Sequence, residues 1–388
     1  MDDWLLYIMI LAAIGIGWLL GSRDITKKSK PPGAKYYNGL NYLLSEEPDR
    51  AVAIFIEDLE VNQETLETHL ALGGLLRRRG ELEKAVIVHE NILTQAQLGK
   101  DTMLKVKLEL ARDYLLAGIL DRAEELSLML SEEDGETRQE GRKITLEIYE
   151  QEREWQQAIE VAQLLAVGAD SEKYEKVISH YYCEIAEELL DSGKIESARE
   201  AIREAIGHSP VNARASLIHG KIDIAEGRYP DAVTALTRIK DQEPVYVPES
   251  LELLISAFEK SDMSRQELRE YLEACLEVVP SISVVLTLAS SMREEIGDEA
   301  TAKYIAEHLK KNPTIRGLTR LVDMHVDNTS GIARQNLTIL RSFAEALVAD
   351  KPAYRCQSCG SEGKKMFWHC AVCKNWATIK PIFGLEGE

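Results

Sequence analysis

The residues with the clearest chemical potential are four cysteines near the C-terminal end of the 388-residue chain. They form two pairs, Cys356 with Cys359 and Cys370 with Cys373, and two residues separate the members of each pair. Such pairs bring thiolates to one tetrahedral metal ion, at about 2.3 Å from the metal when it is zinc. Chance pairing is improbable in a chain with only six cysteines. The spacing therefore predicts one metal ion held by all four thiolates, with disulfides or free thiols as the alternative.

No other part of the sequence offers a catalytic constellation. The signatures of serine hydrolases, P-loop enzymes, zinc proteases and dinucleotide-binding domains are absent, and the eight histidines are scattered. One local cluster, His180-Tyr181-Tyr182-Cys183, is interpreted as helix packing rather than a catalytic dyad. Cys275 falls at a small-residue position of an expected helix, which favours burial over reactivity. The sequence therefore predicts a protein that is not an enzyme.

Charge and composition narrow the class of protein further. The formal net charge is −19, which argues against broad binding to a phosphate backbone, because such binding needs clustered lysine and arginine. Leucine, alanine and glutamate abound while phenylalanine is scarce, as is typical of helical proteins. We expect an all-α protein without a nucleic-acid partner. The segment around the four cysteines is nevertheless locally basic, through Lys364, Lys365, Lys374 and Lys380.

The N-terminal end carries an uncharged apolar stretch over residues 4–22. As an α-helix it would be about 28 Å long, which is close to the hydrocarbon thickness of a bilayer. A cleaved signal peptide is the competing interpretation, but that would need a basic segment before the apolar core. Here Asp2 and Asp3 precede it, and the basic residues follow it. We therefore predict that residues 1–22 form an uncleaved transmembrane anchor.

A basic juxtamembrane linker over residues 23–35 sets the expected orientation. Its cations are Arg23, Lys27, Lys28, Lys30 and Lys35. Since basic flanks stay on the cytoplasmic side, the N-terminus is expected outside and everything after residue 22 in the cytoplasm. Thiols remain reduced there, which supports a metal site over disulfides. The prediction is a single-pass membrane protein whose body lies on the cytoplasmic side.

Small residues recur with a period near 34 residues through the body of the chain, over 36–350. The recurring residue is an alanine: Ala51, Ala85, Ala123, Ala158, Ala198 and Ala232. Twelve positions earlier stands another small residue in most copies, namely Gly39, Gly73, Ala111, Ala186 and Gly220. This pattern resembles the tetratricopeptide repeat, in which two antiparallel helices cross at small residues. Eight or nine such repeats would stack into a superhelix with a concave groove.

Departures from the repeat consensus mark where the array should be irregular. Extra residues near 94–104 and 166–177 predict longer loops or helix ends, and degenerate copies are expected over 283–313 and 315–348. Prolines that close second helices are Pro210, Pro244 and Pro280. In the first copy, one position of the second helix is Phe55. In the later copies the same position is occupied by His89, Ser127, Ala162, Ile202, Leu236 and Leu272. These substitutions weaken any claim of consensus peptide recognition and favour a scaffold.

Residues 351–388 resemble rubredoxin around the first cysteine pair, where Gly360 follows the second cysteine and allows a turn with positive φ. The second pair lacks the corresponding glycine, and the loop between the pairs is much shorter than in that electron carrier. Zinc is therefore favoured over iron. A small core is expected from Phe367, Trp368, Trp376 and Ile379. So short a module would depend on its metal for much of its stability.

The order of anchor, repeats and four-cysteine module resembles the lipopolysaccharide assembly protein B family of Gram-negative inner membranes. The resemblance covers essentially the whole chain. It is carried by residues 68–73, 77–81, 180–184, 368–370 and 376–382. The least typical part is the acidic start at Asp2 and Asp3.

This resemblance implies an adaptor that brings the lipid A-committing UDP-3-O-acyl-N-acetylglucosamine deacetylase to the membrane-bound protease FtsH for degradation. It also implies a second membrane protein that senses lipopolysaccharide and restrains the adaptor. The anchor would contact protease and antagonist, and the four-cysteine module would pack back on the repeats and help to hold the client. Two alternatives stay open: a scaffold that assembles lipopolysaccharide synthesis and export proteins without directing proteolysis, and an iron redox protein.

Overall fold

The computed structural model describes residues 65–95, 98–261 and 263–388, together with six isolated positions: Ala13, Gly15, Asn41, Tyr42, Arg50 and Ile54. Apart from those positions, the predicted anchor, the basic linker and the first repeat lie outside the described residues. Among the helices that are described, none is long and apolar enough to cross a membrane. The chain divides into two compact units, Met1–Glu154 and Trp155–Glu388.

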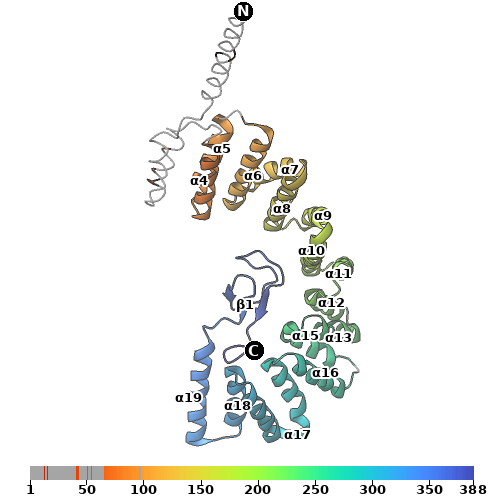
Figure 1. Cartoon of the computed structure of the whole chain (residues 1–388). Coiled ribbons are helices and arrows are strands. Elements are labelled where there is room, and N and C mark those ends of the chain that lie inside the picture. The colour runs from red at the N-terminus through yellow and green to blue at the C-terminus, as the bar shows by residue number, and fades with distance from the viewer. Residues whose placement is uncertain are drawn as a thin grey trace, which may run out of the picture. The chain divides into compact units, whose positions relative to one another are not determined.

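The described part of the first unit is helical, and each helix packs against the next. Its helices are α4 (Leu66–Arg78), α5 (Leu82–Gln95), α6 (Lys100–Leu116), α7 (Leu120–Ser131) and α8 (Gly135–Glu152) (Figure 1). Apolar side chains at helical spacing, such as Leu110, Tyr114 and Ile148, form a core shared by α6, α7 and α8, and a second cluster joins α4, α5 and α6. The unit therefore has the stacked helix pairs that the repeat pattern predicts.

The second unit continues the array and ends in a small sheet (Figure 1). Its long helices are α9 (Trp155–Leu165), α10 (Ser171–Asp191), α11 (Ile195–His208), α12 (Ala213–Ala225), α13 (Tyr229–Thr237), α15 (Val247–Glu259), α16 (Arg265–Val278), α17 (Ile282–Lys311), α18 (Ile315–Asp327) and α19 (Gly331–Val348). Short helical turns are η2 (Gly168–Asp170), α14 (Ile239–Gln242) and η3 (Pro244–Tyr246). Strands β1 (Tyr354–Cys356), β2 (Glu362–Gly363) and β3 (Ile379–Pro381) form an antiparallel sheet in the order β2-β1-β3.

Small residues stand where paired helices cross, as the sequence predicts. A Cβ atom added to Gly220 on α12 would lie 2.6 Å from Leu236 Cγ on α13, and one at Gly73 would collide with the His89 ring. Only glycine allows so close an approach without displacing the neighbouring side chain. The second-helix positions are all buried in the described copies: His89, Ser127, Ala162, Ile202, Leu236 and Leu272.

The predicted irregularities take definite forms. Near 166–177 the extra residues form η2 and the start of α10, which is 21 residues long. The degenerate copy over 283–313 is a helix pair broken at Gly297, whose φ of 78° and ψ of 170° interrupt α17. The copy over 315–348 corresponds to α18 and α19. Helices end before the three prolines, at His208, Gln242 and Val278.

Candidate metal centre

The four cysteines of the C-terminal module converge on one point, as their spacing predicts. All four Sγ atoms lie within 4.8 Å of one another. Cys356 Sγ lies 3.6 Å from Cys373 Sγ, and Cys359 Sγ lies 3.8 Å from Cys370 Sγ. A tetrahedral ion with metal–sulfur bonds of about 2.3 Å separates its sulfur ligands by about 3.8 Å. The geometry therefore fits one four-thiolate metal ion.

Two similar turns present these sulfurs. After the first pair, Gly360 has a φ of 77°, and its N–H donates to the Cys356 carbonyl over 3.0 Å. After the second pair, Lys374 takes a φ of 57°, and its N–H donates to the Cys370 carbonyl over 2.9 Å. A side chain with a Cβ adopts this left-handed conformation at a cost of about 1–2 kcal/mol. The second turn thus keeps the rubredoxin-like geometry without the glycine.

Hydrogen bonds to two of the sulfurs, those of Cys356 and Cys373, favour the thiolate form. Burial of Cys356 opposes ionisation, but hydrogen bonds with the Thr378 hydroxyl and with the Cys359 and Ser358 backbone outweigh this effect, so the pKa of Cys356 falls to about 6. Asn375 Nδ2 donates to Cys373 Sγ over 3.5 Å. Adjacent thiolates repel one another and need a cation between them. Because zinc and iron both accept four thiolates, the donor set fits either ion.

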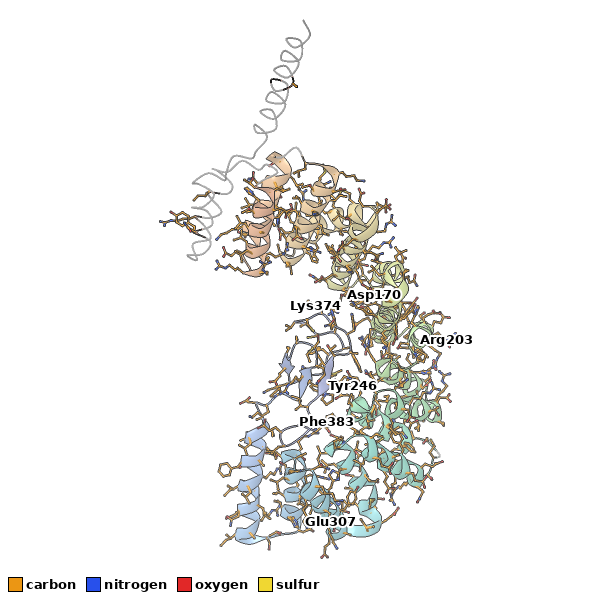
Figure 2. All side chains as sticks on the ribbon, viewed as in Figure 1. Asp170, Arg203, Tyr246, Glu307, Lys374 and Phe383 are labelled. Carbon is orange, nitrogen blue, oxygen red and sulfur yellow. The ribbon has the colours of Figure 1, made fainter. Side chains whose placement is uncertain are left out.

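The module, which we call the head (residues 351–388), docks on the repeats through two tryptophans. Trp376 stacks on His180 at 5.3 Å between ring centroids, and it meets Tyr181 edge-on at 5.7 Å and Trp155 at 6.1 Å. Trp368 lies 4.8 Å from the Tyr246 ring. Figure 1 shows the head inside the curve of the second unit, and Figure 2 shows Tyr246 beside it.

Polar contacts fasten the same face of the head. The Tyr246 hydroxyl donates to the carbonyl oxygens of Ala377 and Ile379, over 3.1 Å and 3.0 Å. The Tyr354 hydroxyl donates to Glu249 Oε1 over 2.8 Å, and Lys380 Nζ lies 3.6 Å from Glu243 Oε1. These contacts join the sheet, and Ala377 just before β3, to η3, to α15 and to Glu243 at the start of η3.

A buried arginine completes the docking site. Arg214 is only 2% exposed, and its guanidinium lies 6.0 Å from the Trp368 ring and 5.9 Å from the Trp376 ring. Its charge is balanced by Glu184 and Glu187, at 2.8 Å and 2.5 Å from Arg214 Nη2. Paired charge together with two aromatic faces makes burial of a guanidinium tolerable. Sequence reasoning did not single out Arg214, since its tryptophan partners lie more than 150 positions away.

The tail after the sheet is attached to the last repeats as well. Glu388 accepts hydrogen bonds from the Ser281 and Ser283 hydroxyls, over 2.9 Å and 2.8 Å, and pairs with Arg316. The N–H of Ile315 donates to the Leu385 carbonyl over 2.8 Å. The contacts of the head, including those of this tail, therefore extend from α9 to α18.

One sequence prediction about the head is wrong. Phe367 does not join a small internal core, because it is 58% exposed. Trp368 and Trp376 also direct their rings at the repeats rather than at each other. A segment this short has little interior of its own, so its large aromatic side chains find burial against the array instead.

The histidines near the head have structural roles. Burial, with smaller contributions from Arg214 and His369, lowers the pKa of His180 to about 3, so this ring stays neutral and stacks on Trp376. His369 also stacks on Trp376, at 4.4 Å between ring centroids, and its Nε2 lies 2.9 Å from the Lys374 carbonyl. Cys275 is fully buried. These findings confirm packing at His180 and burial at Cys275.

Fold and site together define a tetratricopeptide-repeat protein with a docked, rubredoxin-like metal module. Family models agree: residues 354–381 match a rubredoxin metal binding domain, and residues 183–246 match a tetratricopeptide repeat. Lipopolysaccharide assembly protein B of Escherichia coli strain K12 is 34% identical over 389 residues, which cover 99% of each chain. The same-named protein of Haemophilus influenzae is 29% identical and covers 98% of this chain. The chain belongs to the lipopolysaccharide assembly protein B family.

Proposed function

We propose that the protein acts in lipopolysaccharide assembly as a membrane-tethered, cytoplasmic, non-enzymatic adaptor. It presents the lipid A-committing UDP-3-O-acyl-N-acetylglucosamine deacetylase to the protease FtsH, and a lipopolysaccharide-sensing membrane protein restrains it. The observation that carries the proposal is the end-to-end similarity to the named relatives. A helical array with a head fastened to it also supports a role in holding partners rather than in chemistry.

The anchor is part of this proposal. Residues 1–22 would hold the protein in the inner membrane, and the basic residues 23–35 would keep the repeats on the cytoplasmic side. A tether raises the effective concentration of partners confined to the same membrane. A chain that lacks residues 1–22 should therefore fold and yet fail to stimulate degradation.

We further propose zinc as the metal, with a structural role. An ion bound by all four sulfurs of this cluster would have no open position for a substrate. Metal analysis of the purified full chain tests this. Iron with a reversible potential at the site would favour the redox alternative instead.

A cavity beside the head is our candidate for the place where a client segment docks. It has a volume of about 710 Å³ and lies between α10, the start of α12 and residues 375–378. Its lining combines apolar side chains such as Val177 and Val211 with charged ones such as Lys173 and Lys176. That mixture suits a short peptide segment, whose main chain needs polar partners and whose side chains need apolar ones.

A reconstituted degradation assay tests the adaptor proposal. FtsH and the deacetylase are combined in lipid vesicles, with and without the full-length protein, and loss of the deacetylase is followed over time. We expect faster loss with the protein present, and slower loss again with Val211→Glu, which puts a charge in the cavity. Val278→Glu is the matched control, because both valines are 54% exposed and Val278 lies outside the cavity. Unchanged degradation in the presence of the wild-type protein would favour the non-proteolytic scaffold.

A further inference from the structure

The last helix of the array, α19, carries two apolar faces, which lie roughly 110° apart around the helix at about 100° per residue. One face packs on α18 through Leu337, Ala344 and Val348. At the edge of this face Arg341 forms an ion pair with Asp323 on α18, with 3.1 Å between Nη1 and Oδ1. The other face carries large apolar side chains that are 51–76% exposed: Ile332, Ile339, Leu340, Phe343 and Leu347. We call these five residues the α19 stripe. No part of the chain that the structure describes covers them.

The stripe departs from what the end of a repeat array requires. Terminal repeats usually turn a polar face outward, because that face has no further repeat to bury it. In Figure 1 α19 is the outermost helix of the second unit, with α18 beside it. A contiguous exposed apolar patch of this kind marks an interaction surface on a soluble body.

Charge and helical geometry indicate what kind of surface packs there. The three charged residues of α19 are Arg334, Arg341 and Glu345. At about 100° per residue, all three project away from the stripe. The chain as a whole carries a net charge of −19, so two copies repel one another except where their facing surfaces are neutral. Apolar surfaces with few charges are typical of homodimer interfaces.

The stripe is also self-complementary about a two-fold axis. If two α19 helices lie antiparallel with the axis between Ile339 and Leu340, Ile332 of one copy meets Leu347 of the other. Ile339 then meets Leu340, and only Phe343 faces a polar residue, Asn336. We propose that the α19 stripe is a homodimer interface with this antiparallel register. With α18 behind each α19, the two copies complete a four-helix layer.

Mass measurement on the full chain in mild detergent tests the interface. We expect a dimer that dissociates on dilution, and a dissociation constant raised at least tenfold by Phe343→Glu. Thr338→Glu is the matched control, since Thr338 is an exposed residue on another face of α19 and its substitution should leave the dimer intact. A wild-type chain that stays monomeric, or a dimer that Phe343→Glu does not weaken, would overturn the proposal.

Cysteine cross-linking tests the register. A disulfide needs Cα atoms within about 7 Å, and Ile339 lies next to the proposed axis, so Ile339→Cys should link two copies. The two copies of Ile332 would lie about 22 Å apart along the helices, so Ile332→Cys alone should not link. The double variant Ile332→Cys with Leu347→Cys should link again. The wild-type chain controls for the native cysteines. Linkage of Ile332→Cys alone, or of Ile339→Cys only to a different protein, would contradict the proposed interface.

Discussion

Replacing Trp376 by alanine should release the head from the repeats without unfolding it. The ring contacts His180, Tyr181 and Trp155, and lies 5.9 Å from the Arg214 guanidinium. Aromatic pairs contribute about 0.5–1.5 kcal/mol each. A cation over a ring adds about 0.5–1 kcal/mol. Together the lost contacts amount to about 3 kcal/mol, which raises the undocked population about a hundredfold.

Hydrogen exchange of residues 354–381 measures that population, because exchange of amides shielded by docking depends on how often the head opens. Metal content is measured in the same samples and should stay at one ion per chain, since none of the four ligands is changed. Phe367→Ala is the control: it removes an aromatic ring from the same module, but one that is 58% exposed. Unchanged exchange in Trp376→Ala, or an equal change in Phe367→Ala, would refute the reasoning.

Three further predictions concern the metal, the repeats and the pH dependence. Changing both Cys356 and Cys359 to serine should abolish metal binding and unfold the head, while circular dichroism still reports helical repeats; a metal-free variant with an ordered head would contradict this. Gly220→Ala should lower the free energy of unfolding by about 1–3 kcal/mol, because its Cβ would lie 2.6 Å from Leu236 Cγ. Gly207→Ala, with open space around it, should be neutral or stabilising by up to about 1 kcal/mol in the same urea titration. His180 has a folded-state pKa of about 3 against 6.5 for the ordinary group, so its contribution is complete above pH 6.5. That contribution should fall by about 1.4 kcal/mol per pH unit below that pH, and urea titrations of His180→Gln should lack this component.

Features that depend on local spacing could be predicted from the sequence. The four ligands follow from two short motifs, and the positive φ of Gly360 follows from its place after Cys359. The helix crossings follow from residues such as Gly220, because the partner helix comes next in the chain. Each of these predictions depends only on residues within one repeat or within the turn around one cysteine pair.

The docking of the head could not be predicted from residue patterns in the same way. Trp376 and His180 stack although 196 positions separate them, and no periodicity links an aromatic residue in the head to a particular helix. Phe367 and Trp368 are adjacent and both aromatic, yet only Trp368 packs against the repeats. The direction of each side chain is set by the sheet and by the curvature of the array, which emerge only in the assembled fold.

The most direct test of the central proposal is the half-life of the lipid A-committing deacetylase in cells after protein synthesis is stopped. Cells with the wild-type protein, without it, and with Trp376→Ala are compared. The adaptor account predicts a markedly longer half-life when the protein is absent, and a longer half-life with Trp376→Ala than with the wild type. A half-life that is the same with and without the protein would contradict the account and favour a non-proteolytic assembly scaffold.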